Sequence, residues 1–188
     1  MSQILNVAFD MCAWETLGSL ANGCTLCIRG RSREEWESVL RSVDVVISTP
    51  TILQSYCAQD YPNVRFVVTA GEPCPKALAD SWSRTATFFN SCGPTEVRPH
   101  VHSIFFILNT PQTTIVNTID IHQHGKPVSI GRPTPNNRIY ILDENRNPLP
   151  IGEVGIMWAS GRGISSGYVN KPALTKERFV LDPFVRDG

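Results

Sequence analysis

The first half of the chain alternates short apolar runs with segments whose apolar residues recur at helical spacing. Trp14, Leu17 and Leu20 lie three residues apart and predict a helix that stops near Gly23. Ser32, with two glutamates close behind it, predicts the cap of a second helix that runs to about residue 41. Further helices are expected over residues 50–58 and 75–84, and strands over residues 24–28, 43–48, 64–69 and 86–90. This alternation predicts a parallel α/β sheet.

The last third of the chain shows strand patterns and little helical spacing. Residues 138–143 and 154–159 are predicted strands joined by a turn-rich connection, and one helix is expected over residues 173–179. We expect these residues to form a small antiparallel, barrel-like β subdomain.

A stretch rich in Pro and Gly, residues 127–137, predicts the junction between two subdomains. The α/β subdomain is therefore expected over residues 1–125 and the β-rich subdomain over residues 126–188.

Composition narrows the class of protein. The chain has 188 residues, 41% of them hydrophobic, so it can build a core and is not a disordered tail. Lys plus Arg number 17 and Asp plus Glu number 17, which argues against nucleic acid or an anionic membrane as partner. No apolar run is long enough to span a membrane, and no signal peptide is recognisable, so a cytoplasmic location is expected.

The cysteines fit that compartment. Cys24 and Cys27 form a C-x-x-C pair, which in some proteins is a redox or zinc site. Residues three apart on a strand point to opposite faces, and no second pair stands at zinc spacing. We therefore interpret these cysteines as small buried hydrophobic residues.

Two loops follow predicted parallel strands and are candidates for chemistry. Ligands of open parallel sheets bind beyond the carboxyl ends of the strands. The loop at residues 69–73 contains Gly71, which permits close approach of backbone to a ligand. The loop at residues 90–96 combines a Gly, a Pro, a hydroxyl that can bond a phosphate oxygen and a carboxylate that can hold Mg²⁺.

The motifs resemble those of a known family. Asn90-Ser-Cys-Gly-Pro-Thr-Glu96 is similar to the N-x-Y-G-P-T-E signature of amino-acid adenylation domains in nonribosomal peptide synthetases, within the acyl-adenylate-forming superfamily. Phe9-Asp10 followed by Trp14-Glu15 resembles the motif F-D-x-S-x-W-E. Residues 151–168 resemble G-E-L-x-I-x-G-x-G-x-A-R-G-Y, and residues 170–179 continue the match. The resemblance implies a truncated, internal part of the large N-terminal domain of such an enzyme.

The resemblance assigns roles to single residues. Asp10 would pair with the α-ammonium group of an amino acid, a charge-assisted contact. The side-chain pocket would be lined by Met11, Trp14, Ile47, Val68, Ala70, Ser91, Ile115 and Val116. The ATP site would include Gly71, Glu72, Asn90, Ser91, Cys92, Gly93 and Thr95. Catalysis is assigned to Thr95, which would contact the α-phosphate, and to Glu96, which would hold Mg²⁺.

The implied reaction joins an amino-acid carboxylate to the α-phosphate of ATP and releases pyrophosphate. The aminoacyl group would then pass to phosphopantetheine on a carrier domain, next to condensation domains, in the synthesis of a secondary metabolite. The apolar pocket predicts an aliphatic or aromatic amino acid. Two alternatives stay open, an acyl-CoA ligase and a non-catalytic binding module or pseudogene product.

The chain also departs from the family. The family's phosphate loop, ribose aspartate and lid lysine do not occur in it, Cys92 replaces an adenine-stacking aromatic residue, and Ser166 replaces an arginine. The chain alone is therefore expected to be inactive. Residues 97–112 interrupt the match, since Glu96 joined directly to Thr113 restores it.

We interpret residues 97–112 as a translated intron of a fungal gene, with a genuine surface loop as the alternative. Codons for Val97 and Gln112 fit the two ends of an intron, and those for Leu108-Asn109 fit a branch site. As a loop, the segment would expose an aggregation-prone apolar run. His100 and His102 lie inside this segment, and His122 and His124 lie nearby; without a third ligand, a solvated loop is the expectation for each pair.

Overall fold

The computed structural model describes residues 1–93, 103–106, 118–161 and 164–185, and the chain divides into two compact units. The first unit consists of Met1–Cys92 and Thr118–Gly131, and the second of Gly93–Asn117 and Arg132–Gly188. The subdomain boundary between residues 125 and 126 stays a prediction.

The first unit holds most of the helices. Its strands are β1 (Ser2–Gln3), β2 (Cys27–Ile28), β3 (Val45–Ser48), β4 (Phe66–Thr69), β5 (Thr87–Cys92) and β7 (Thr118–Ile121). Its helices are α1 (Asp10–Ala21), α2 (Arg33–Ser42), α3 (Pro50–Leu53), the 3₁₀ helix η1 (Ala58–Asp60) and α4 (Lys76–Trp82).

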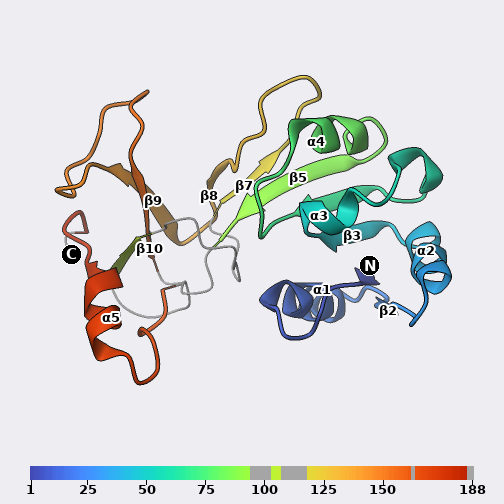
Figure 1. The fold of residues 1–188 in the computed structure, drawn as a ribbon, viewed down its shortest axis with the longest axis horizontal. Helices are drawn as coiled ribbons and strands as arrows, with labels where there is room; N and C mark the ends of the chain where they lie inside the picture. The colour runs from blue at the N-terminus through green and yellow to red at the C-terminus, as the bar shows by residue number, and fades with distance from the viewer. Residues whose placement is uncertain (94–102, 107–117, 162–163, 186–188) are drawn as a thin grey trace. The chain divides into compact units, whose positions relative to one another are not determined.

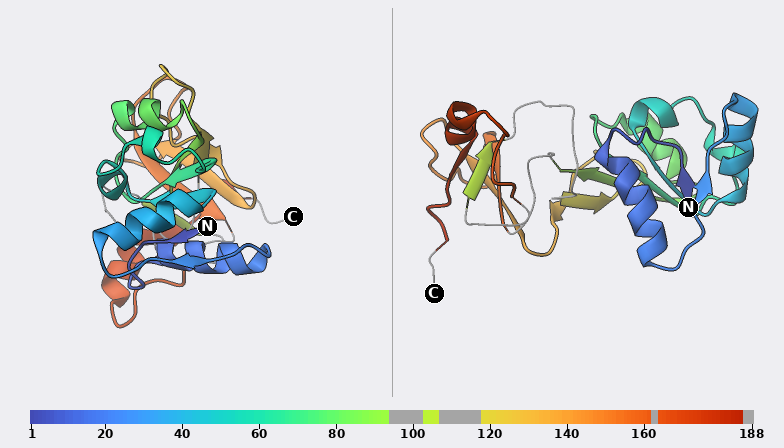
Figure 2. Two further views of the ribbon diagram at one scale, coloured as in Figure 1. Left: turned by 90° about the vertical axis from the view of Figure 1, so that its right-hand side faces the viewer. Right: turned by 90° about the horizontal axis from the view of Figure 1, so that it is seen from below.

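The central sheet of this unit has the predicted parallel arrangement. Strand β4 pairs in parallel with β3 and with β5, and β7 pairs antiparallel to β5. Helix α1 lies on one side of the sheet and α4 on the other (Figure 1, and the side-on view in the left panel of Figure 2). The prediction of a parallel α/β fold is confirmed.

Local sequence explains why these elements form. The Ser32 hydroxyl accepts a hydrogen bond from the Glu35 N–H at 3.2 Å, and a Glu35 carboxylate oxygen accepts one from the Ser32 N–H at 3.1 Å. This capping box starts α2 at the predicted place. The β-branched strands bury Val46 and Val67 completely, together with Phe88. Apolar burial of this kind is the main favourable term in folding.

Two predicted elements are shorter than expected. The strand expected over residues 24–28 is confined to Cys27–Ile28, because the chain is still closing helix α1 at Cys24, whose N–H donates to the Ser19 carbonyl at 2.9 Å. Cys24 is exposed, so its interpretation as a buried residue was wrong. The helix expected over residues 50–58 ends at Leu53, since the chain folds back and sets the Tyr56 ring edge-on to Tyr61.

The second unit is a small β structure. Its elements are β6 (Ser103–Phe106), β8 (Arg132–Pro133), β9 (Asn137–Leu142), β10 (Ile156–Gly161), α5 (Pro172–Arg178) and β11 (Phe179–Leu181). Four of the strands form an antiparallel sheet in the order β11-β6-β10-β9.

The expected barrel is not closed among the described strands of this unit. Strands β9 and β11 lie at opposite edges of the four-stranded sheet, and a barrel of so few strands would leave no room for a core. In this sheet, Leu142 of β9 and Trp158 of β10 are buried together in a small apolar cluster. Within the described part of the chain, no helix is both long enough and apolar enough to cross a membrane.

Candidate active site at the carboxyl edge of the parallel sheet

The carboxyl ends of the three parallel strands lie in register at one edge of the sheet. Ser48 of β3 is opposite Thr69 of β4, and Thr69 is opposite Asn90 of β5. The two loops singled out from the sequence, which follow β4 and β5, therefore leave neighbouring strands at the same edge. A ligand held by both loops needs this arrangement.

The predicted pocket residues of the sheet share one face. Ile47 and Val68 are opposite one another in the ladder, and Ala70 and Ser91 follow with the same alternation. Their neighbours along the strands point the other way, toward α4, where the Phe88 ring contacts His122, which bonds Asp80 of α4.

Helix α1 supplies the remaining described pocket residues. Met11 is buried and Trp14 is partly buried in the same apolar core as Ile47, Val68 and Ala70. Asp10 is the first residue of the helix and is half-buried there. A helix N-terminus carries a partial positive charge, and an acidic side chain is common at this position. The structure thus brings together an acid and an apolar surface from elements far apart in the sequence.

A hydrogen-bonded network orders the polar edge. The Asn90 amide nitrogen donates to the Ser129 carbonyl at 2.9 Å, and its amide oxygen accepts from the Thr69 hydroxyl at 3.1 Å. The Ser91 hydroxyl donates to the Thr69 carbonyl at 2.9 Å. These bonds tie the start of the Gly-Pro-Thr-Glu loop to β4 and to the segment before β8. The sequence offered no signal for the contact with Ser129.

The loop after β4 is held by a contact that the sequence analysis also missed. One carboxylate oxygen of Glu72 accepts from the Thr51 N–H at 3.0 Å and from the Thr51 hydroxyl at 2.6 Å. Gly71 next to it has φ +86°, a backbone conformation that favours glycine. Glu72 therefore joins the loop after β4 to the start of helix α3, and its carboxylate is already engaged with protein donors.

The described residues at this edge fit the nucleoside end of ATP. Gly71 lets the backbone approach a planar base closely, and the side chains of Asn90 and Ser91 on the neighbouring strand are neutral and polar. Cys92 is half-buried, and burial raises the pKa of its thiol, so it is an uncharged neighbour. Gly93 is buried just after β5. Four predicted site residues, Thr95, Glu96, Ile115 and Val116, lie outside the described residues.

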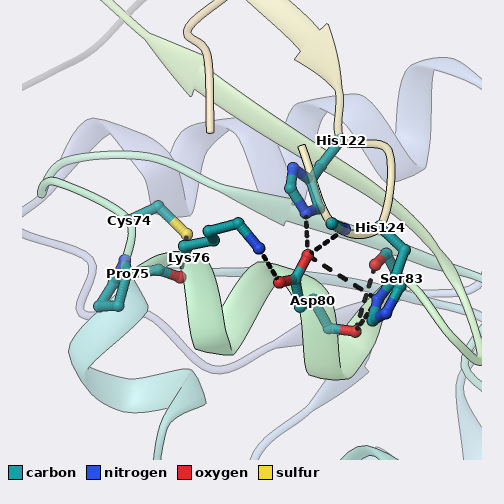
Figure 3. A network of polar contacts seen from close by, with 8 residues as sticks. Cys74, Pro75, Lys76, Asp80, Ser83, His122 and His124 are labelled. Atoms are coloured by element: carbon teal, nitrogen blue, oxygen red, sulfur yellow. Dashed lines mark hydrogen bonds and ion pairs between the residues drawn. The ribbon is translucent and has the colours of Figure 1, made fainter. Parts of the chain in front are cut away.

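A second polar cluster lies on the opposite face of the sheet, around Asp80 of α4 (Figure 3). Its carboxylate contacts Lys76, accepts from the Gly125 N–H at 2.8 Å, and lies 2.8 Å from the His122 imidazole. Lys76, the Gly125 N–H and His122 hold the pKa of Asp80 well below its usual range.

The histidines of this cluster differ from expectation. His122 is buried, so a solvated loop was the wrong expectation for it, because the turn after β7 packs onto Asp80; His124 is half-exposed. Within the described ranges, no group of three His, Cys, Asp or Glu side chains is placed to hold a metal ion.

Comparison with known proteins gives the class. The AMP-binding enzyme family matches residues 1–169, and the chain belongs to this family. Within it, two adenylate-forming reductases of Coprinopsis cinerea, 03009 and 06235, are 53% and 51% identical over 188 residues. Nonribosomal peptide synthetase pboA of Aspergillus ustus is 33% identical over 98% of the chain. The chain spans only 17% of the length of each reductase and 8% of the synthetase.

Solved structures agree on the fold. The N-terminal subdomain of Klebsiella oxytoca NpsA, in complex with 3-hydroxyanthranilyl-AMSN, superposes with a TM-score of 0.76 at 22% identity, covering 95% of this chain and 44% of that chain. A four-domain nonribosomal peptide synthetase bound to AMP and glycine gives 0.78 at 23% identity, covering 97% of this chain and 13% of that one. The chain thus has the fold of these adenylate-forming domains.

Proposed function

We propose that the chain is the substrate- and nucleotide-binding part of an enzyme that activates an amino acid with an apolar side chain. The observation that carries the proposal is the position of Asp10. It starts helix α1, next to Met11, which packs in the same apolar cluster as Val68. An acidic side chain beside apolar side chains suits a substrate with an ammonium group and an apolar side chain.

In this proposal, ATP supplies an electrophilic phosphorus and a leaving group. A substrate carboxylate oxygen forms the bond to the α-phosphorus, the α–β phosphoanhydride bond breaks, and pyrophosphate leaves with the electron pair. Asp10 holds the ammonium group, and the segments held in place by Glu72 and Asn90 orient the nucleoside. Thr95 and Glu96 are proposed to contact the α-phosphate and Mg²⁺. Positioning and charge neutralisation carry chemistry of this kind.

The step after adenylation separates two candidates. The resemblance to peptide synthetases suggests that the aminoacyl group passes to phosphopantetheine on a carrier domain and then enters a condensation step. The higher identity to adenylate-forming reductases, 53% against 33% for the synthetase, favours a protein in which a bound acyl thioester is reduced. A nicotinamide-dependent release of aldehyde or alcohol by the longer protein would support the second candidate.

ATP–pyrophosphate exchange with the longer protein tests the first step. We expect exchange with apolar amino acids, and Asp10→Asn should lower kcat/KM about 100-fold, chiefly through KM, since the ammonium contact is about 2.7 kcal/mol. Asp60→Asn, an exposed residue of η1, is the matched control and should change nothing. Better exchange with carboxylic acids that lack an amino group, unaffected by Asp10→Asn, would contradict an amino-acid substrate.

We further propose that residues 97–112 are a translated intron of a fungal gene. Adenylate-forming reductases and a synthetase from fungi match the chain, in support of a fungal source. Strand β6 lies within this segment and pairs with β10 and β11. This pairing is what the alternative, a genuine structural element, requires. A mature transcript that joins the codons of Glu96 and Thr113 supports the intron, and one that retains the segment refutes it.

A further inference from the structure

Helix α1 carries a buried acid that the proposed reaction does not use. Glu15 follows Trp14 directly, lies about a turn and a half of helix beyond Asp10, and is fully buried. A buried carboxylate is unfavourable unless donors compensate it. The hydrogen-bond partners of Glu15 therefore indicate its role.

Both oxygens of Glu15 bind main-chain donors that lie far earlier in the chain. One accepts from the Ile4 N–H at 2.9 Å and the other from the Leu5 N–H at 3.1 Å. Strand β1 ends at Gln3, so these two N–H groups lie beyond its pairing with β2. Without Glu15 both would be buried donors without an acceptor.

The carbonyl groups of the same two residues are also held. Arg29 donates to the Ile4 carbonyl at 2.8 Å, and the Gln3 side-chain amide donates to the Leu5 carbonyl at 2.6 Å. Burial raises the pKa of Glu15 to about 7, against the lowering effect of the two N–H groups and of Arg29. Residues 4 and 5 are therefore fixed on both sides.

The segment that leaves this anchor leads straight into the first turn of α1. Phe9 occupies the N-cap position and makes no side-chain capping hydrogen bond. The approach to the helix is ordered by Asn6, whose side chain accepts from the Ala8 N–H at 2.9 Å and whose carbonyl accepts from the Phe9 N–H at 3.0 Å. A helix start without a side-chain cap depends on the chain that enters it.

We propose that Glu15 is a positioning residue: by anchoring residues 4 and 5 to the middle of α1, it sets where Asp10 meets the substrate. The ligand of Asp10 rests on the proposed function, but the anchor does not. Substrate affinity depends on Glu15 although Glu15 touches no substrate. A displaced Asp10 binds the ammonium group of the substrate more weakly, while the position of the loops near the nucleotide does not change.

The test compares Glu15→Gln with wild type in the longer protein. A Gln side chain keeps one acceptor oxygen, but its NH₂ group cannot accept, so one main-chain N–H loses its partner. We expect KM for the amino acid to rise about tenfold, while kcat and KM for ATP stay within about twofold. Glu37→Gln is the matched control, because Glu37 is a partly exposed acid of α2 paired with Arg33. Unchanged KM for the amino acid, or a fall in kcat alone, overturns the proposal.

Amide hydrogen exchange provides a measurement that needs no activity. Glu15→Gln should speed exchange in residues 3–12 and leave residues 45–53 as in wild type; equal protection of residues 3–12 in both proteins overturns the anchor. If wild type exchanges pyrophosphate with no carboxylic acid, the proposed function fails, and hydrogen exchange alone then decides whether Glu15 holds the segment.

Discussion

The two faces of the parallel sheet each carry an acid on the covering helix, and the two acids behave in opposite ways. Glu15 on α1 is fully buried, and loss of solvent raises its pKa to about 7. Asp80 on α4 keeps 18% of its side chain exposed, and Lys76, the Gly125 N–H and His122 lower its pKa. For Glu15, whose hydrogen-bond donors are neutral amides, burial has the largest effect on the pKa. For Asp80, which keeps some contact with solvent, a cation and several donors have the largest effect.

The largest test of this contrast removes the buried acid. Glu15→Ala leaves the Ile4 and Leu5 N–H groups buried without an acceptor, and we expect the free energy of unfolding to fall by about 4 kcal/mol at pH 5. Urea unfolding followed by tryptophan fluorescence measures it. Glu37→Ala should cost under about 1 kcal/mol, as expected of a surface ion pair. Equal losses for both variants would show that Glu15 is no anchor.

The next test uses pH. The pKa of Glu15 is raised from 4.5 to about 7, so its contribution to stability is complete below pH 4.5 and is lost as pH rises through 7. The change is about 3 kcal/mol and should disappear in Glu15→Gln. Asp80, whose pKa is lowered from 3.8, has the opposite sign: its contribution is present above pH 3.8 and is lost in stronger acid. Unfolding curves of wild type, Glu15→Gln and Asp80→Asn between pH 3 and 8 separate the two.

The smallest test compares two histidines next to Asp80. The His122 side chain is 1% exposed and that of His124 is 48% exposed. We expect His122→Ala to lower the free energy of unfolding by about 2 kcal/mol and His124→Ala by under about 0.5 kcal/mol. Thermal unfolding at pH 7 distinguishes them. A larger loss for His124→Ala would mean that Asp80 is held mainly from the exposed side.

Sequence patterns predicted much of the first unit because its signals are local. The capping residue Ser32 and the β-branched strands act within a few residues of themselves, and the structure has α2, β3 and β4 close to where they were expected. The order of the loops at the sheet edge followed from the strand–helix alternation alone. The family resemblance then attached chemistry to that edge.

Contacts between segments far apart in the chain could not be predicted from the sequence. Nothing near Glu15 indicates that its partners are eleven and ten residues earlier, and Asp80 meets His122 across 42 positions. The solvated loop expected for His122 failed for the same reason, since its burial depends on α4. Asn90 was expected to lie near the nucleotide, and its bonds to Thr69 and Ser129 could not be read from its motif.

The alternation of side chains along β3 and β4 has a consequence for neighbouring positions of the same strand. Ile47 and Val68 face α1, whereas Val46 and Val67 face α4 and have no exposed surface. In the proposed function, substitutions at Ile47 or Val68 would alter what a ligand meets, while Val46 and Val67 pack on the other face of the sheet. In the proposed function, neighbouring positions of one strand therefore serve separate purposes, one toward the substrate and the next toward the scaffold of the sheet.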